Sequence, residues 1–414
     1  MSELVWHTLS LNFRANKYLW KTSFQWDPIQ RQFLHIPGTF RTFFWWYFVV
    51  FFINICITLN CCGYIILGQL YKFHPRIPVW VTVQYFIAAA GIWLAGGVAI
   101  FFIFFGDHTV LIVNTIIQVY EDFEDSIKGR KLIQKKKWKG IQIPPILLNP
   151  EGKLDKPGLV LFSILAPLPF IPLPMTLVDV FVLKMDVYIF VLEKILPHEI
   201  ANSLLLIPLR AGLLYIVAAE VARIVPFLLY VLAIPAQLII KSVDTLLNIR
   251  LEPATTRARW NETLNYFNQL IIMNRVVESY LATIAFILMG SGLVLSSALN
   301  FATIRLYDIG LPFVFYLTYP FFAVCVLTII LSLLPVGIRI HERSATTLVK
   351  WRQILGARDA QFAKRLRGTR PLIFYAGLNA HNFYSIQKSL MTTYIMAIVD
   401  YTINLLVSFP TLHF

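Results

Sequence analysis

The amino-acid sequence predicts an all-α membrane protein with seven transmembrane helices, its N-terminus in the cytoplasm and its C-terminus outside. The composition is far from that of a soluble domain: 57% of the 414 residues are hydrophobic, 14% are charged, and the mean hydropathy is +0.67. Charge-free runs long enough to cross about 30 Å of hydrocarbon recur along the chain. Lysine and arginine are also concentrated in alternate connecting segments, which is the main signal for membrane orientation.

Seven segments account for the predicted spans. Five contain no charged residue: Thr42–Tyr71, Ile77–Gly106, Pro157–Val178, Ser279–Ile304 and Ile309–Ile338. Ala201–Ile240 is long enough but is interrupted by three charged residues, and Ser389–Pro410 is interrupted only by Asp400. With these spans, 28 of the 36 lysines and arginines fall in the N-terminal segment and the even-numbered connections, against 5 in the other connections. The N-terminus and those connections are therefore expected in the cytoplasm.

This topology divides the chain into four parts. We expect a cytoplasmic N-terminal segment (1–42), helices one to six with basic inner loops (43–340), a cytoplasmic helical anchor (341–389), and a last helix with a short outer tail (390–414). Within the anchor, Leu348, Leu355, Phe362 and Leu366 fall on one helical face, and Gly368 is expected to end that helix.

Two spans are irregular. In the third, Pro167, Pro169, Pro172 and Pro174 cannot all be absorbed by a regular helix, so either the helix breaks within the membrane or the crossing starts late and continues past Asp179. The fourth span carries Arg210, Glu220 and Arg223. Glu220 and Arg223 are three residues apart and can pair on one helical face, whereas Arg210 can extend to the interface or face a polar cavity.

The last span carries a stripe of small and polar residues. Ser389, Thr393, Ala397, Asp400, Asn404 and Ser408 are spaced by three or four residues, so they share one face of an α-helix. A carboxylate in a bilayer needs water or a partner. Either the stripe lines an aqueous path, with Val407 as a nearby apolar constriction, or it packs against the chain's own bundle.

The sequence offers no catalytic motif, and we expect neither an enzyme nor a cofactor. The pair His341-Glu342 lacks the second histidine of a zinc protease, and the four cysteines lie in spans one and six with no metal-binding spacing. The basic run Lys128–Lys139 is interpreted as a topogenic or lipid-facing segment, so the net charge of +14 requires no nucleic acid.

The end of the chain resembles the insect gustatory and odorant receptors. Their last span carries Thr-Tyr, five hydrophobic residues and Gln-Phe. Here the lead-in, whose core is Ile386, Lys388, Ser389 and Leu390, places Asp400-Tyr401 at the Thr-Tyr position and Val407-Ser408 at the Gln-Phe position. A second register, Thr393-Tyr394 followed by Asp400-Tyr401, keeps neither the lead-in nor the distance to the C-terminus. The first register is preferred, and it indicates a divergent member.

The resemblance implies a chemosensory receptor of the plasma membrane that acts as a ligand-gated, non-selective cation channel. Members assemble as four subunits, identical or related, joined through a cytoplasmic anchor around a pore lined by the last helix. The expected pore-lining residues are Thr393, Ala397, Asp400, Asn404, Val407 and Ser408. A small-molecule ligand is expected in the outer half of the bundle. Candidate contacts there are Trp80, Tyr85, Arg210, Tyr215, Tyr316 and Tyr319.

Two other functions are compatible with the sequence. A secondary transporter would use Asp400 with Arg210 or Glu220 as a coupled site, although no internal repeat supports this. A membrane scaffold would need no polar stripe at all.

Overall fold

The fold was analysed in a computed structural model. It describes residues 3–37, 40–71, 77, 79–127, 147, 155–183, 186–201, 203–248, 257–307, 313–355, 360–378 and 381–409. Six helices in these ranges are long and apolar enough to cross a membrane, and a bent pair of helical segments makes up to seven. The predicted all-α membrane fold is confirmed, and the chain is a multi-pass membrane protein.

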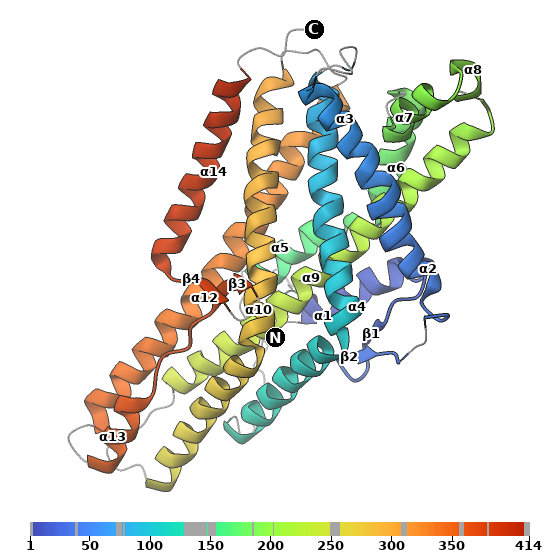
Figure 1. Cartoon of the computed structure of the whole chain (residues 1–414). Coiled ribbons are helices and arrows are strands. Elements are labelled where there is room, and N and C mark those ends of the chain that lie inside the picture. The colour runs from blue at the N-terminus through green and yellow to red at the C-terminus, as the bar shows by residue number, and fades with distance from the viewer. Residues whose placement is uncertain are drawn as a thin grey trace, which may run out of the picture.

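The long helices follow the apolar runs of the sequence (Figure 1). The first span is one continuous helical segment built from α2 (Phe44–Tyr47), a π-helix (Phe48–Leu59) and α3 (Asn60–Leu70). The other five are α4 (Val79–Ile127), α9 (Leu206–Asn248), α10 (Arg257–Arg305), α12 (Thr318–Leu355) and α14 (Lys388–Ser408). Three short helices, α7 (Val187–Ile195), α8 (His198–Ala201) and α11 (Phe313–Tyr316), precede α9 and α12.

The third span is broken at its prolines. Helix α5 (Lys156–Leu165) is followed by a 3-10 turn (Leu168–Phe170), α6 (Pro172–Leu177) and a π-helical turn (Val178–Val182), with a bend of 47° between the two halves. The first alternative is therefore confirmed, because the helix breaks. The late start of the second is wrong, because α5 begins at Lys156, although the segment does continue past Asp179. Pro167 and Pro172 lie at the breaks between α5, the 3-10 turn and α6, where each lacks a backbone N–H donor.

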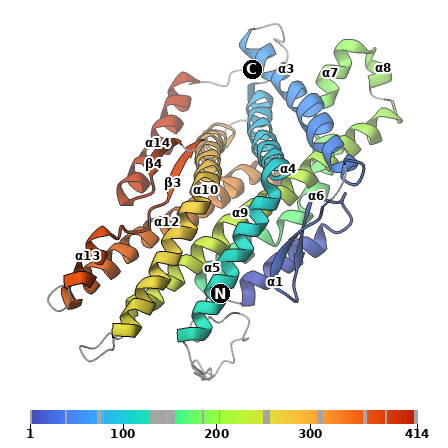
Figure 2. The same cartoon turned by 60° about the horizontal axis from the view of Figure 1, so that its bottom comes forward.

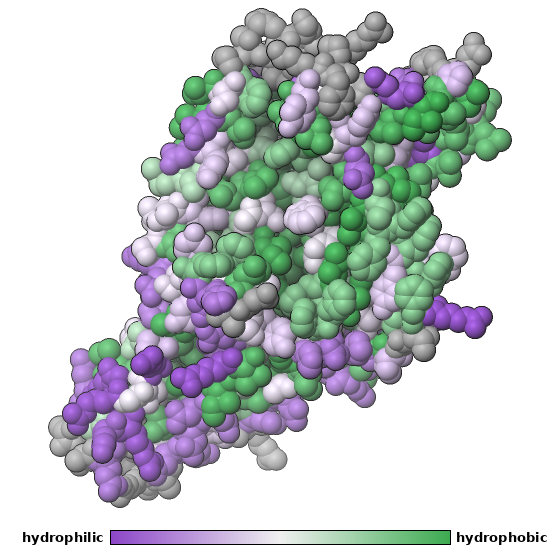
Figure 3. All heavy atoms as spheres, in the orientation of Figure 1, coloured by the Kyte–Doolittle hydropathy of each residue, from purple (hydrophilic) through white to green (hydrophobic). Residues whose placement is uncertain are grey.

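Four helices continue well beyond their apolar stretches at one end of the molecule. The ends of α4, α9, α10 and α12 lie there, with α13 (Ala360–Gly368) against α12 (Figures 1 and 2). Their buried contacts include Phe267 against Trp351, with ring centroids 5.6 Å apart. Hydrophilic side chains cover this end, and a hydrophobic belt covers the spans above it (Figure 3).

The expected anchor is only partly helical. Leu348 and Leu366 are both buried, but they lie on two helices, because α12 ends at Leu355 and α13 begins at Ala360. Gly368 ends α13 as predicted. An antiparallel hairpin then follows, formed by β3 (Tyr375–Leu378) and β4 (His381–Ser385), and it corrects the all-helical expectation. Strand β3 packs on α10, so the hairpin ties the start of α14 to the bundle.

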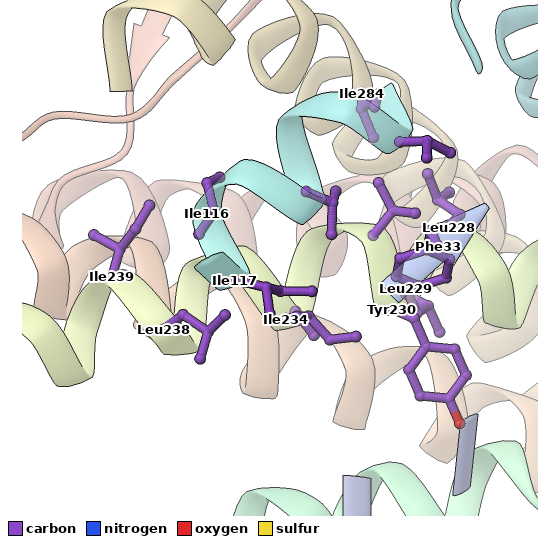
Figure 4. Packing of buried hydrophobic residues seen from close by; sticks show 14 of the residues in the cluster. Phe33, Ile116, Ile117, Leu228, Leu229, Tyr230, Ile234, Leu238, Ile239 and Ile284 are labelled. Carbon is purple, nitrogen blue, oxygen red and sulfur yellow. The ribbon is translucent and has the colours of Figure 1, made fainter. Parts of the chain in front are cut away.

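The N-terminal segment belongs to the core. Helix α1 (Glu3–Ala15) and an antiparallel pair, β1 (Phe24–Asp27) and β2 (Gln32–His35), pack beside α4, α5 and α9. The rings of Trp6 and Trp26 stack at 5.1 Å, and Phe24 stacks on Phe227 of α9 at 3.8 Å. The main core continues between α4 and α9, where Ile117 lies near Ile234 (Figure 4). Packing of many aromatic rings holds this junction together.

Candidate functional site

Helix α14 lies at the edge of the bundle and packs on α10 and α12 (Figure 1). Its buried residues, Tyr394, Ile398 and Thr402, repeat every four positions and so face one side. The Tyr394 hydroxyl donates to the Met289 carbonyl at 2.6 Å. Gly292 makes this approach possible, because a Cβ there would lie 2.8 Å from the Tyr394 hydroxyl oxygen.

The C-terminal half of α14 is held by hydrogen bonds from α10 side chains to its backbone. Ser297 donates to the Ile398 carbonyl at 3.4 Å, and the Arg305 guanidinium donates to the Leu406 carbonyl at 2.8 Å. A cation at the C-terminal end of a helix also interacts favourably with the helix dipole. The position of α14 is therefore fixed by specific bonds as well as by apolar packing.

The polar stripe faces away from the chain's own bundle. The residues predicted to line a pore are exposed, with the exception of Ala397, which is half-buried. The exposed ones are Thr393, Asp400, Asn404, Val407 and Ser408. The alternative in which the stripe packs inside the bundle is therefore wrong for the single chain. A second exposed face of α14 is apolar and includes Met396, Val399 and Ile403.

The family-like lead-in forms the joint between the hairpin and α14. The Ile386 amide donates to the Phe374 carbonyl at 2.8 Å, and its buried side chain fits against Gly337 of α12, where a Cβ would lie 3.0 Å from Ile386 Cγ2. Lys388 and Ser389 are exposed at the first turn of α14, and Leu390 is half-buried. Asp400 and Tyr401, at the Thr-Tyr position, are both exposed.

The six candidate ligand residues do not form one pocket. Trp80, Tyr85 and Tyr319 belong to one buried cluster, and Tyr316 packs against it while donating to the Thr303 carbonyl at 2.9 Å. Tyr215 instead lies against Tyr18 of the N-terminal segment, with 3.1 Å between the hydroxyl oxygens.

Arg210 is buried and forms an ion pair with Asp186, at 3.2 Å between Nη1 and Oδ2. Asp186 also accepts from the Ile189 amide at 3.0 Å and so caps α7. Burial raises the pKa of the Asp186 carboxyl, although the Arg210 guanidinium and the backbone amides favour the charged form. Arg210 therefore has a structural partner, and it does not extend to the interface.

Glu220 is fully buried and accepts hydrogen bonds from three side chains. The indole N–H groups of Trp20 and Trp46 donate to it at 3.0 and 2.9 Å, and Arg223 forms the predicted pair one turn along α9. Arg223 also donates to the Trp20 carbonyl at 2.8 Å and lies over the Trp20 ring. Among the described residues, Glu220 and Arg210 have partners of their own, and neither pairs with Asp400. The coupled transporter site is not assembled.

A cavity of about 460 Å³ lies between the helices. It is lined by α4, α5, α6, α9, α10, α12 and α14, and none of the six candidate ligand residues lines it. The sequence did not reveal it because apolar residues on buried and lipid-facing helix surfaces are indistinguishable by composition.

The fold and α14 together define a class: a seven-helix membrane protein whose last helix presents a polar stripe away from its own bundle. Comparison with solved structures finds a similar fold in the olfactory receptor OR5 from the insect Machilis hrabei, in complex with eugenol. The two structures superpose with a TM-score of 0.61 and are 11% identical in sequence. The alignment covers 98% of this chain and 97% of the receptor chain. A second structure of the same receptor gives a TM-score of 0.52 at 11% identity, and that alignment covers 85% of this chain and 88% of the receptor chain.

No family model and no curated protein sequence matches the chain. The likeness to insect receptors is therefore one of fold, and at that level it confirms the resemblance seen in residues 384–409.

Proposed function

We propose that this protein is a subunit of a chemosensory, ligand-gated cation channel in the plasma membrane, similar to gustatory receptors. The observation that carries the proposal is the exposed polar stripe of α14 in a chain with the insect olfactory receptor fold. A single stripe cannot enclose a path, so several copies must bring their α14 helices together, most simply by rotational symmetry. The family resemblance implies four, identical or related.

Two exposed faces of α14 suit this assembly. Asp400, Asn404 and Ser408 would face the axis, and the apolar face with Met396, Val399 and Ile403 would face lipid or a neighbouring copy. Four Asp400 carboxylates would form a ring of the kind that selects cations. Asn404 and Ser408 lie one and two turns further out, with Val407 as an apolar constriction beside them.

The orientation supports the same arrangement. The extended ends of α4, α9, α10 and α12 carry the basic connections, so this end is proposed to face the cytoplasm. An epitope tag after Phe414 would then be labelled on intact cells, and one at Met1 would be labelled only after permeabilisation. Glycan at Asn261, whose sequon would be cytoplasmic, would contradict this orientation.

The test of the proposed function is single-channel recording of the purified protein in a planar bilayer, comparing wild type, Asp400→Asn and Asp107→Asn. Asp107 is an exposed acid on α4 and serves as the matched control. Asp400→Asn is expected to shift the reversal potential in a salt gradient toward lower cation selectivity while openings persist, and Asp107→Asn is expected to leave it unchanged. Equal reversal potentials in all three proteins would place Asp400 off the path. The absence of any conductance over a broad panel of ligands would contradict the channel.

A further inference from the structure

The cavity is long as well as apolar. On α12 it is lined by residues that recur every three or four positions from Phe321 to Gly337, and on α9 from Leu214 to Ala236. At 1.5 Å per residue, these stretches run about 24 and 33 Å along the helices. The hydrocarbon core of a bilayer is about 30 Å thick. The cavity therefore extends along most of the membrane depth, which is much longer than a compact aromatic molecule.

Its lining excludes a polar occupant. Among the lining residues, the hydroxyl and thiol groups are those of Tyr375, Tyr394 and Cys325, and Tyr394 already donates to the Met289 carbonyl. The rest are aliphatic, aromatic, glycine, proline and methionine side chains. Water gains too few partners in such a cavity to fill it, and an empty one would lose dispersion contacts along its walls.

The cavity also communicates with the lipid-facing surface. Phe321 of α12 and Met175 of α6 line it, yet they are 48% and 44% exposed. Both lie within candidate spans, so we expect their exposed parts to face hydrocarbon. Acyl chains are the molecules at highest concentration there, and they have the length and flexibility that the cavity requires.

We propose that this cavity is a binding site for the acyl chain of a membrane lipid, which enters between α6 and α12 and extends along α9, α10 and α12. The lining includes Tyr394 and Gly292, the two residues that set how closely α14 approaches α10. The bound chain therefore supports the contact on which α14 rests. Only an effect of the bound lipid on channel opening would rest on the proposed function; the binding of the lipid does not.

The site is tested by photolabelling in nanodiscs, with phosphatidylcholine that carries a diazirine near the middle of one acyl chain. Two matched pairs on α12 separate the cavity from the outer surface. Val326 and Leu333 line the cavity, whereas Val324 and Leu331, two positions before each, are 62% and 42% exposed. The variants Val326→Phe and Leu333→Phe fill the cavity, and Val324→Phe and Leu331→Phe add the same bulk outside it.

In wild type, labelled peptides are expected to include inward-facing positions of α9 and α10. Labelling of these positions should fall several-fold in at least one cavity variant that elutes as folded protein, and should persist in both surface variants. Labels confined to outward-facing side chains would overturn the proposal. So would full displacement of the label by a short compact apolar molecule, which would assign the cavity to small ligands. Labelling requires no conductance, so failure of the channel hypothesis would leave this result intact.

Discussion

Glu220 and Asp400 both lie within apolar helices, but their surroundings differ. Glu220 of α9 is fully buried and accepts hydrogen bonds from Trp20, Trp46 and Arg223. Asp400 of α14 is exposed on a face that the rest of the chain leaves uncovered. A buried charge whose partners all come from its own chain has a structural role, because removing one partner leaves the other charge buried and uncompensated. A membrane carboxylate on a free face needs water or another molecule, and this requirement is the basis of the functional role proposed for Asp400.

The largest expected effect is at the buried acid. Glu220→Ala leaves the Arg223 guanidinium and two indole N–H groups without their acceptor, and losing one partner of a buried ion pair costs about 3–5 kcal/mol. We expect a large loss of monodisperse protein in detergent and a strongly lowered unfolding temperature. Glu220→Gln, which keeps an acceptor, should recover part of both. Wild-type stability in Glu220→Ala would contradict the structural role assigned to Glu220 in the comparison with Asp400.

A smaller effect is expected at one donor of the same cluster. Trp20→Phe retains the ring under Arg223 but removes the indole N–H bonded to Glu220. A hydrogen bond to a charged group contributes about 1.5–3 kcal/mol. The unfolding temperature should fall, less than in Glu220→Ala, and Trp20→Phe should add little once Glu220 is replaced by alanine. Additive losses in the double variant would show that the two residues act independently.

A substitution at the contact between α10 and α14 is expected to lower the stability less than the loss of Glu220. In Gly292→Ala the new methyl group would lie 2.8 Å from the Tyr394 hydroxyl oxygen, and such overpacking costs about 1–3 kcal/mol. The strain should be partly relieved by Tyr394→Phe. A matched substitution is Gly290→Ala, one of the glycines with no neighbouring atom within 4 Å of an added Cβ. Equal unfolding temperatures for Gly290→Ala and Gly292→Ala would argue against a tight α10–α14 contact.

The smallest effect on stability is expected at Asp400. Because the side chain is exposed, Asp400→Asn should change the free energy of unfolding by no more than about 0.5 kcal/mol. Thermal unfolding in the same detergent should therefore match wild type, even where conductance differs. A loss comparable to that of Glu220→Ala would place Asp400 in a structural role.

The sequence predicted those features that depend on one helix at a time. Charge-free runs predicted the membrane spans, and four prolines indicated that the third span is irregular. The spacing of Glu220 and Arg223 predicted their ion pair. The stripe from Ser389 to Ser408 could also be predicted, because helical periodicity decides which residues share a face. Whether that face pointed inward or outward was left open, because orientation depends on what the other helices already cover.

Features that depend on distant segments were missed. Trp20 and Trp46 lie about 200 and 174 residues from Glu220, and their spacing in the sequence carries no sign of a shared acceptor. The hairpin of β3 and β4 is short, and its strands are stabilised by packing on α10 more than by their own propensity. Tyr215 was grouped with the outer aromatic residues by its position in the span, but its place on the helix turns it toward Tyr18.

The hairpin also decides how α14 can move. It holds the first turn of the helix against the bundle, whereas the far end is held by the bond from Arg305 to the Leu406 carbonyl and by the contact of Phe409 with Phe301. A helix of 21 residues is about 30 Å long, so a tilt of roughly 10° about its base would displace the far end by about 5 Å. In the proposed assembly, a small adjustment at Ile386 and Gly337 would therefore produce a large change in the width of the path at the far ends of the α14 helices.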